Sequence, residues 1–392
     1  MANIKDVAAP LRTLNPDDEN WSDFAPIREL IGNARVVSVG ESAHGVGEFF
    51  NLRQRLFRFL VKELGFTAYC TEFPFDEGMR INEWIHGGPG TVNDVTDHGK
   101  HVSLGEGREA GAHLEWMRSW NAKNGNRLNF YGLDVGSPVG MVRQCLARIP
   151  AKPGDAELLK LADLGEGFTG VIAKLMGMPE PDRARLDQGL ADLVNRAKAS
   201  GNDVAVRCAV GAIASVHSVS DRATNFADGN NRREEYMADN VAWVLQRERR
   251  IMIGGHNTHV RRDTIPVPAL GTLLQAQLPE PPVVIGTSYG AGSIWRIDNM
   301  TAPPNEWTIS VQELKPPAGT LDAVMSTVGL PLHFVDLHRV PDQQLAEATS
   351  MLVFHDPWPV NVREAFDAVI HVQNARNTDE SVAGARKTFI AG

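Results

Sequence analysis

Hydrophobic residues follow two different spacings in the stretch 35–72. Residues 36–39 form a short run rich in valine, which is typical of a buried strand. Over 49–64 the apolar residues recur every three or four positions, which predicts an amphipathic helix that Gly65 ends. A second short apolar run at 66–70 predicts another strand. This order of elements predicts a βαβ unit, in which the two strands lie parallel.

Similar patterns recur along the rest of the chain. Further strands are predicted at 128–133, 251–255, 283–287, 293–297 and 351–354. The glycine-rich segment between 283–287 and 293–297 predicts a hairpin turn, and 351–354 is expected to be the last strand. The alternation of strands and helices predicts an α/β fold with a central, mostly parallel sheet flanked by helices.

Four segments lack the strand pattern. Residues 153–247 carry helix-spaced apolar residues only, which predicts a helical lobe inserted within a single domain that spans 1–392. A helical lead-in is expected before the first strand, over 1–34. Residues 91–108 are expected to form a loop near the site, and 381–392 a C-terminal tail.

Composition narrows the class of protein. The chain has 392 residues, of which 43% are hydrophobic, enough for a large core. A net charge of −9 disfavours a nucleic-acid partner. No apolar run approaches the ~18 residues of a membrane span, and the N-terminus lacks the apolar core of a signal peptide. The three cysteines form no CxxC pair, so we expect reduced thiols in a cytoplasmic protein that does not bind membranes.

Ionisable residues follow the first two predicted strands. Glu41 and His44 come after the first strand, and Glu72 lies at the end of the second. The carboxyl ends of parallel strands meet at one edge of a sheet, where α/β proteins bind their ligands. An imidazole beside a carboxylate is suited to act as a general base on water. A structural alternative remains open, in which Ser42 caps the following helix and His44 is satisfied by hydrogen bonds.

The carboxylate of Glu72 needs a partner if it is buried. Arg53 and Arg55, on the predicted helix, are the candidates for an ion pair with it. Such a pair is compatible with a purely structural role, and equally with a rigid carboxylate that orients another group.

His256 and His259 follow the strand predicted at 251–255. Their spacing resembles a metal-binding pair, but no third ligand follows at a matching spacing and HExxH is absent. A general base also needs a free ring nitrogen, which a metal ion would occupy. We therefore predict a site without metal or other cofactor.

Two glycine-rich motifs suggest a serine hydrolase instead. Residues 286–290 match the G-x-S-x-G nucleophile elbow around Ser288, and 86–90 match the glycine-rich oxyanion loop of some α/β-hydrolases. A nucleophile elbow requires a strand, a turn and a helix, whereas Ser288 is followed by the strand predicted at 293–297. The glycine loop likewise ends a helix instead of following a strand. The context therefore disfavours this interpretation.

Several stretches resemble the erythromycin esterase family. They are VVSVGESAHGVGEFFNLRQRLFRFLVKELGF, YCTEF, NEWIHGG, FYGLDV, RREEYMADNVAWVL and IMIGGHNTHV, which occur in the family's order. The resemblance implies an α/β core with helical additions, hydrolysis of macrolide lactone esters by water, and hence antibiotic resistance. By the same resemblance, the catalytic positions are His44, Glu41, Glu72 and His256, and the substrate-binding positions are Arg55, His259, Arg233 and Asp134.

The sequence therefore predicts a hydrolase that acts on a small-molecule ester or macrolide. His44 takes a proton from water, Glu41 or Glu72 orients its ring, and the hydroxide attacks the carbonyl directly. His256 then stabilises the oxyanion or protonates the leaving alkoxide. The alternatives are a serine hydrolase acting through Ser288 and a catalytically silent homologue that binds a ligand or a metal.

Overall fold

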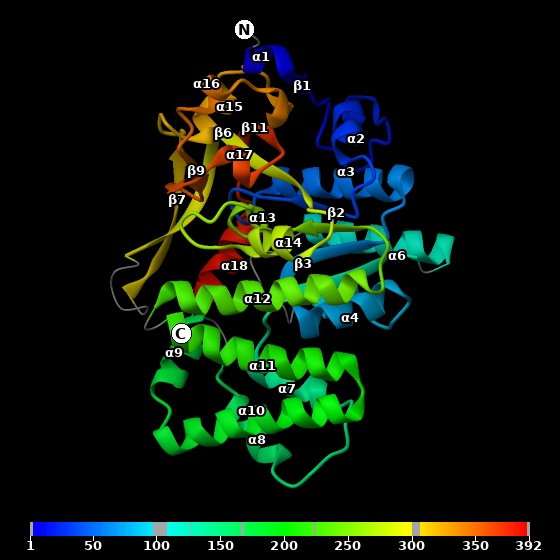
Figure 1. The fold of residues 1–392 in the computed structure, drawn as a ribbon, viewed down its shortest axis with the longest axis vertical. Coiled ribbons are helices and arrows are strands. Elements are labelled where there is room, and N and C mark those ends of the chain that lie inside the picture. Colours follow the sequence, from blue (N-terminus) through cyan, green and yellow to red (C-terminus); the bar gives the residue numbers. More distant parts are fainter. Residues whose placement is uncertain are drawn as a thin grey trace.

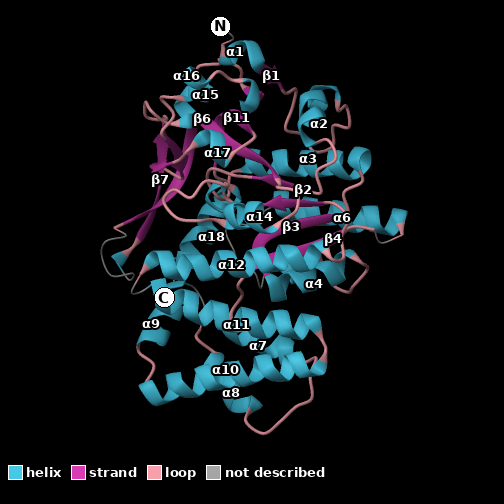
Figure 2. Ribbon diagram, in the orientation of Figure 1, coloured by secondary structure: helices cyan, strands magenta, loops and turns pink. Residues whose placement is uncertain are grey.

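A mixed sheet forms the centre of the protein (Figures 1 and 2). The structure, a computed structural model, describes residues 3–96, 108–125, 127–165, 168–222, 225–299 and 306–389. Within these residues the sheet has nine strands in the order β1-β8-β11-β6-β2-β5-β3-β4, with β7 paired to β6. The strands are β1 (Ala8–Pro10), β2 (Val36–Val39), β3 (Ala68–Pro74), β4 (Asn129–Asp134), β5 (Ile251–Gly254), β6 (Val283–Asp298), β7 (Thr308–Leu314), β8 (Leu332–Asp336) and β11 (Ala368–Arg376).

Strands β4, β3, β5, β2, β6 and β11 run parallel to their neighbours, whereas β1, β7 and β8 are antiparallel. A separate hairpin consists of β9 (Ser350–Val353) and β10 (Asp356–Pro359). The predicted α/β fold with a mostly parallel sheet is confirmed. The parallel pairing also places the carboxyl ends of β2, β3, β4 and β5 at one edge of the sheet.

Helices cover the sheet on both sides (Figure 2). The helices and 3₁₀ turns outside the lobe are α1 (Ile4–Val7), η1 (Ser22–Phe24), α2 (Ala25–Ile31), α3 (Gly47–Leu64), α4 (Phe75–Ile85), α5 (Val92–Thr96), α6 (Arg108–Asn124), α13 (Asn257–Val260), α14 (Leu270–Gln277), α15 (Leu321–Ser326), η4 (Leu337–Arg339), α16 (Asp342–Leu345), α17 (Val362–Ala365) and α18 (Asp379–Phe389). The helix predicted over 49–64 is α3, which ends as predicted at Gly65, a left-handed residue with φ 69°. None of the helices in the described part of the chain is long and apolar enough to cross a membrane.

Six helices between β4 and β5 build the helical lobe. They are α7 (Pro138–Leu146), α8 (Asp155–Ala162), α9 (Phe168–Met176), α10 (Glu180–Ser200), α11 (Asp203–Arg222) and α12 (Phe226–Leu245). Leu186, Leu190 and Val216 belong to a core of this lobe. Figure 1 shows α8 and α10 at the end of the molecule remote from the N-terminus, with α12 nearer the sheet. Met237 and Val241 of α12 pack against the β3–β5 region, so α12 joins the lobe to the sheet.

The predicted hairpin between 283–287 and 293–297 is wrong. Both segments belong to one continuous strand, β6, and Ser288 lies in its middle. The glycines there serve close packing, because a Cβ on Gly290 would lie 2.3 Å from the side-chain nitrogen of Gln373 on β11. Sequence alone could not distinguish a glycine that allows this approach from one that makes a turn.

The C-terminal predictions also need correction. Residues 351–354 overlap β9, but β10 and the central strand β11 follow it, so β9 is not the last strand. The expected tail at 381–392 is mostly helix α18, where Ser381 and Ala385 are buried. In the expected loop at 91–108 the structure describes α5 and the start of α6, and 97–107 lie outside the described residues. The lead-in is helical in part, with edge strand β1 within it.

Candidate active site

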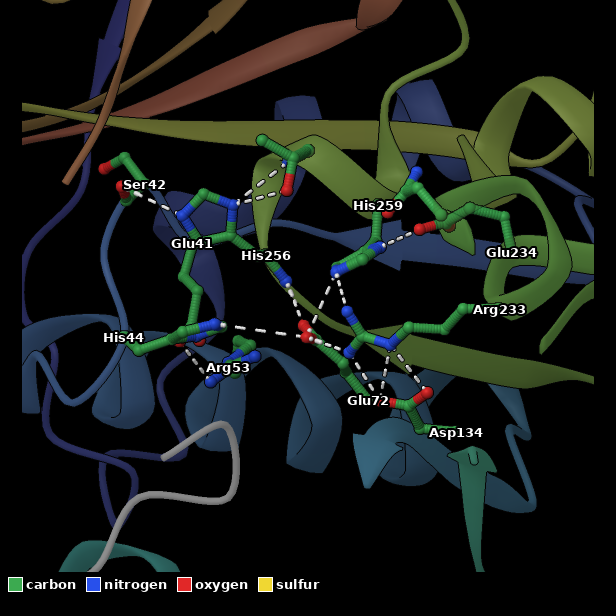
Figure 3. A network of polar contacts seen from close by, with 12 residues as sticks. Glu41, Ser42, His44, Arg53, Glu72, Asp134, Arg233, Glu234, His256 and His259 are labelled. Atoms are coloured by element: carbon green, nitrogen blue, oxygen red, sulfur yellow. Dashed lines mark hydrogen bonds and ion pairs between the residues drawn. The ribbon is translucent and has the colours of Figure 1, made fainter. Parts of the chain in front are cut away.

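Ionisable side chains converge at the carboxyl edge of the sheet (Figure 3). Glu41 and His44 follow β2, Glu72 lies near the end of β3, Asp134 ends β4, and His256 follows β5. Helix α13 adds His259, and α12 adds Arg233 and Glu234. The residues that the sequence predicted, with the exception of Arg55, are therefore brought together, although they come from segments more than 200 residues apart.

His44 is held by the carboxylate of Glu41. The Nδ1 atom of His44 lies 2.6 Å from Oε1 of Glu41, whose side chain is completely buried. Arg53 donates from Nη2 to the other oxygen, Oε2, at 2.5 Å. Because Nδ1 carries the proton given to Glu41, the lone pair of His44 is on Nε2. The ring is 16% exposed, so this nitrogen belongs to a group that solvent reaches.

The geometry also settles the capping alternative. Helix α3 begins at Gly47, with Val46 and not Ser42 at its N-cap. Gly45 has φ 70°, and a Cβ there would lie 1.6 Å from the hydroxyl oxygen of Ser381 on α18. The segment between β2 and α3 is therefore a tight loop beneath α18, and it holds His44 outside the helix.

Glu72 lies between four groups. Its Oε1 accepts from Nη2 of Arg233 at 2.8 Å, and it lies 3.1 Å from Nε2 of His259 and 4.0 Å from Nε2 of His44. Its Oε2 accepts from the backbone N–H of His256 at 3.1 Å. Burial alone would raise the pKa of Glu72, but His259, His44 and Arg233 outweigh it and hold that pKa well below its usual value. Glu72 is therefore a fixed negative charge facing His44.

His259 is clamped between two carboxylates. Its Nδ1 lies 2.6 Å from Oε1 of Glu234, and its Nε2 lies 3.1 Å from Oε1 of Glu72. Burial alone would lower the pKa of His259, but Glu234 and Glu72 raise it to about 10. The ring is therefore an imidazolium at neutral pH, and both of its nitrogens donate.

His256 has the opposite protonation state. Its Nδ1 accepts from the backbone N–H of Thr258 at 3.2 Å, and its Nε2 donates to the carbonyl of Ser42 at 3.2 Å. Burial and the neighbouring His44 hold the pKa of His256 well below its usual value. The ring is therefore neutral, with its single proton committed to Ser42.

Charges across the site nearly balance. Asp134 accepts hydrogen bonds from Nε and Nη2 of Arg233, which together form a bidentate ion pair. The site thus contains the carboxylates of Glu41, Glu72, Asp134 and Glu234 and the cations Arg53, Arg233 and His259. Arg222 also interacts electrostatically with Glu72, Asp134 and Glu234, so four cations accompany the four carboxylates.

Arg55 lies on another face of α3. Its side chain is fully buried, and it donates from both terminal nitrogens to Asp23 at 2.8 Å while its guanidinium lies 4.2 Å above the ring of Phe24. The predicted pairing of Glu72 with Arg53 or Arg55 is wrong, because Arg53 pairs with Glu41 and Arg233 pairs with Glu72. Two residues along a helix rotate by about 200°, so the side chains of Arg53 and Arg55 point in opposite directions.

Sequence reasoning missed two further residues near the histidines. Glu234 follows Arg233 in the RREEYMADN stretch, and nothing distinguishes it there from its exposed neighbour Glu235. Phe354 comes from the β9–β10 turn, and its ring centroid lies 5.3 Å from that of His44. No local pattern could have indicated either contact.

Ser288 lies away from this edge, within β6. It is fully buried, and its Oγ lies 2.9 Å from Nδ1 of His371 on the adjacent strand β11. Burial lowers the pKa of His371 to about 3.

Among the residues that the structure describes, no group of three or more His, Cys, Asp or Glu side chains is arranged to hold a metal ion.

A histidine oriented by a carboxylate, at the carboxyl edge of an α/β sheet, is an arrangement that can activate water for hydrolysis. The chain belongs to the erythromycin esterase family, whose sequence profile matches residues 61–375, and this identifies it as an ester hydrolase. Erythromycin esterase type II of Escherichia coli is 25% identical over 410 residues, which cover 95% of this chain and 97% of that protein. The resemblance found in the sequence is thereby confirmed.

Two solved structures share the fold. A variant of the erythromycin esterase EreC in its open conformation has a TM-score of 0.78 at 20% identity, covering 94% of this chain and 98% of that one. A succinoglycan biosynthesis protein has a TM-score of 0.77 at 21% identity, covering 95% and 96%. Both likenesses extend over nearly the whole chain, so the sheet and its helical additions form one shared architecture.

Proposed function

We propose that the protein hydrolyses an ester or macrolactone by direct attack of a water that His44 activates. The observation that carries this proposal is the pair of His44 and Glu41, in which Nε2 is left free to accept a proton. A water bound at about 2.8 Å to both Nε2 of His44 and Oε1 of Glu72 fits the 4.0 Å that separates these atoms. Glu72 would orient this water, and Glu41 would stabilise the imidazolium that forms.

The geometry changes the role that we propose for His256. Its only proton is committed to Ser42 and its pKa is depressed, so it is a poor donor to an oxyanion or an alkoxide. Arg233 is better suited, because it is a cation whose Nε and Nη2 are fixed by Asp134 and Glu72 at the site, with Nη1 3.4 Å from Nε2 of His259. We therefore assign oxyanion stabilisation to Arg233, and to His256 the task of fixing Ser42 beside His44.

His259 and Asp134 hold Glu72 and Arg233 in the state that this mechanism requires. The His259 imidazolium and the Arg233 guanidinium keep Glu72 ionised, and Asp134 holds the guanidinium in place. Arg55, proposed from the sequence to bind substrate, is fully engaged by Asp23, so its assignment moves to a structural role.

The serine alternative has little support from the geometry. Ser288 is fully buried in mid-strand, and its partner His371 is a poor base with a pKa of about 3. A serine-directed phosphonate tests it directly, because labelling of Ser288 in an intact-mass measurement would revive an acyl-enzyme. The silent-homologue alternative requires ligand binding without turnover.

The substrate class follows from the relatives. A macrolide lactone is the natural candidate, because two relatives are named erythromycin esterases. Hydrolysis of such a lactone would confer antibiotic resistance. Mass spectrometry after incubation with macrolides and simple esters tests this, with His44→Asn as the blank. Addition of one water to a substrate by the wild type alone supports the proposal. If no ester is hydrolysed, the proposal is contradicted.

The three free, buried cysteines fit the proposed cytoplasmic location.

The proposed mechanism needs no metal. Ligation would occupy Nε2 of His44, the atom assigned to the proton, and a metal would acidify the water without a base. We expect full activity after exhaustive dialysis against a strong chelator. Stoichiometric metal by elemental analysis, with activity lost on its removal and restored by zinc or manganese, would replace the general-base mechanism.

A further inference from the structure

An aromatic ring from a remote part of the chain rests on both site histidines. Phe354 stacks on His256 with ring centroids 5.3 Å apart and an interplanar angle of 16°. It meets His44 edge-on at 5.3 Å and 73°. Trp295 packs against it at 4.9 Å. Phe354 thus covers one side of the two imidazoles, although it lies in the β9–β10 turn, more than 300 residues after His44.

The backbone of Phe354 is unusual. The turn joins Val353 to Asp356 through two residues, Phe354 and His355. Phe354 has a φ of 56°, a conformation that favours glycine and that bulky side chains rarely adopt. A residue chosen only for turn formation would be glycine or asparagine here. The phenyl group is therefore retained against the local backbone preference, and such outliers gather at functional sites.

Three hydrogen bonds hold the turn in this conformation. The N–H of Phe354 donates to the carbonyl of Ser42 at 3.0 Å, and Tyr289 donates its hydroxyl to the carbonyl of Phe354 at 2.6 Å. On β9, two residues before Phe354, the N–H of Leu352 donates to the carboxylate of Asp322 at 2.9 Å. The Ser42 carbonyl therefore accepts from both Phe354 and His256, which couples the turn to the protonation state of the site.

We propose that Phe354 is a positioning residue for the hydrolytic reaction. Its ring closes one face of His44 and His256 to solvent, and its N–H holds the Ser42 carbonyl that fixes the proton of His256 on Nε2. Water then approaches Nε2 of His44 from the side of Glu72, where it is oriented for attack. The inference rests on the proposed function of His44, and it extends that function to a residue outside the sheet edge.

The variant Phe354→Gly separates the ring from the backbone. Glycine adopts this φ without strain and keeps the N–H bond to Ser42, so we expect the turn to keep its conformation, while the lost packing against Trp295 lowers the melting temperature. Loss of the ring admits water, so we expect kcat to fall roughly 10- to 100-fold with a smaller change in KM. In ¹⁵N-detected NMR titrations the pKa of His256 should rise toward its ordinary value, because its burial is reduced.

Two variants serve as controls. Phe354→Leu keeps an apolar cover in the same backbone conformation and should recover most of kcat. Trp358→Ala, on β10 of the same hairpin, removes a partly buried aromatic side chain of ordinary backbone conformation. It should lower the melting temperature and leave both kcat and the His256 titration unchanged.

The outcomes separate this inference from the proposed function. If Phe354→Gly, like Trp358→Ala, changes only the melting temperature and leaves kcat and the His256 titration unchanged, Phe354 is only a packing residue and the inference is wrong. If His44→Asn retains activity, the proposed function fails, whereas the His256 titration still reports whether Phe354 controls the protonation of that ring.

Discussion

Helix α3 carries two arginines, only two positions apart, that serve different parts of the protein. Arg53 reaches the sheet edge and holds Glu41, the carboxylate that orients His44. Arg55 reaches the opposite side and binds Asp23, together with the backbone carbonyls of Thr13 and Asn20. One face of the helix thus supports the chemistry, and the other anchors the N-terminal segment.

The comparison shows that a buried ion pair does not by itself indicate a functional site. Both pairs are nearly inaccessible to solvent, and both join an arginine of α3 to a carboxylate of a preceding segment. The difference lies in what the carboxylate contacts next. Glu41 orients the ring of His44, which solvent reaches, whereas Asp23 accepts a hydrogen bond from the backbone N–H of Arg12. The two faces should therefore respond differently to substitution.

The largest effect is expected on the catalytic face, from His44→Asn. Asparagine can hydrogen-bond to Glu41, but it cannot accept a proton from water near neutral pH. We expect kcat to fall by roughly 10²- to 10⁴-fold, the usual contribution of a general base, with the melting temperature nearly unchanged. Steady-state kinetics and thermal unfolding check this. Retention of more than a tenth of the wild-type activity would remove His44 from the role of base.

The structural face should show the converse result. Arg55→Ala removes the buried cation of Asp23 and leaves it with Arg12 at 4.0 Å, so we expect the free energy of unfolding to fall by about 3 kcal/mol, the lower end for broken buried pairs. Activity per folded molecule should be unchanged at temperatures where the variant is folded. Denaturant unfolding and active-site-normalised kinetics measure the two quantities.

Arg53→Lys provides the matched control on the catalytic face. Lysine keeps the charge but loses the planar guanidinium that holds Glu41, so we expect a fall in kcat of roughly tenfold. If Arg55→Ala lowers the activity of folded protein and Arg53→Lys does not, the division between the two faces is wrong.

Local patterns predicted much of the fold because they reflect local packing. The strand at 36–39 and the helix that ends at Gly65 follow from residue spacing alone, and together they place Glu41 and His44 at the sheet edge. The choice between Arg53 and Arg55 requires the helical register, which the loop before Gly47 sets. Glu234 and Phe354 reach the site through tertiary contacts, so no local pattern could predict them.

The active site and the structural face of α3 should also differ in how their contribution to stability depends on pH. The pKa of His259 is raised to about 10 in the folded protein, above its ordinary value of 6.5. Its contribution to stability is therefore fully present below pH 6.5 and is lost as the pH rises through 10. Burial alone would raise the pKa of Asp23, but hydrogen bonds from Arg55 and Arg12 outweigh burial and lower that pKa, so Asp23 stays ionised throughout this range.

Melting temperatures between pH 7 and pH 10 test this difference. The destabilisation caused by His259→Gln should shrink as the pH rises, whereas that caused by Arg55→Ala should stay constant over the same range. A constant cost for His259→Gln would mean that its ring is neutral already at pH 7, contrary to its position between Glu234 and Glu72.

The smallest effect on catalysis is expected from Ser288→Ala, which tests a third buried polar pair. Ser288 and His371 have the distance of a nucleophile and its base, but they lie in mid-strand and solvent does not reach Ser288. Removing the hydroxyl leaves Nδ1 of His371 without this partner, so we expect a loss of about 1–3 kcal/mol in stability. The value of kcat should stay unchanged, because neither side chain lies at the carboxyl edge of the sheet. A loss of activity comparable to that of His44→Asn would instead place the nucleophile in β6 and remove water from the attacking role.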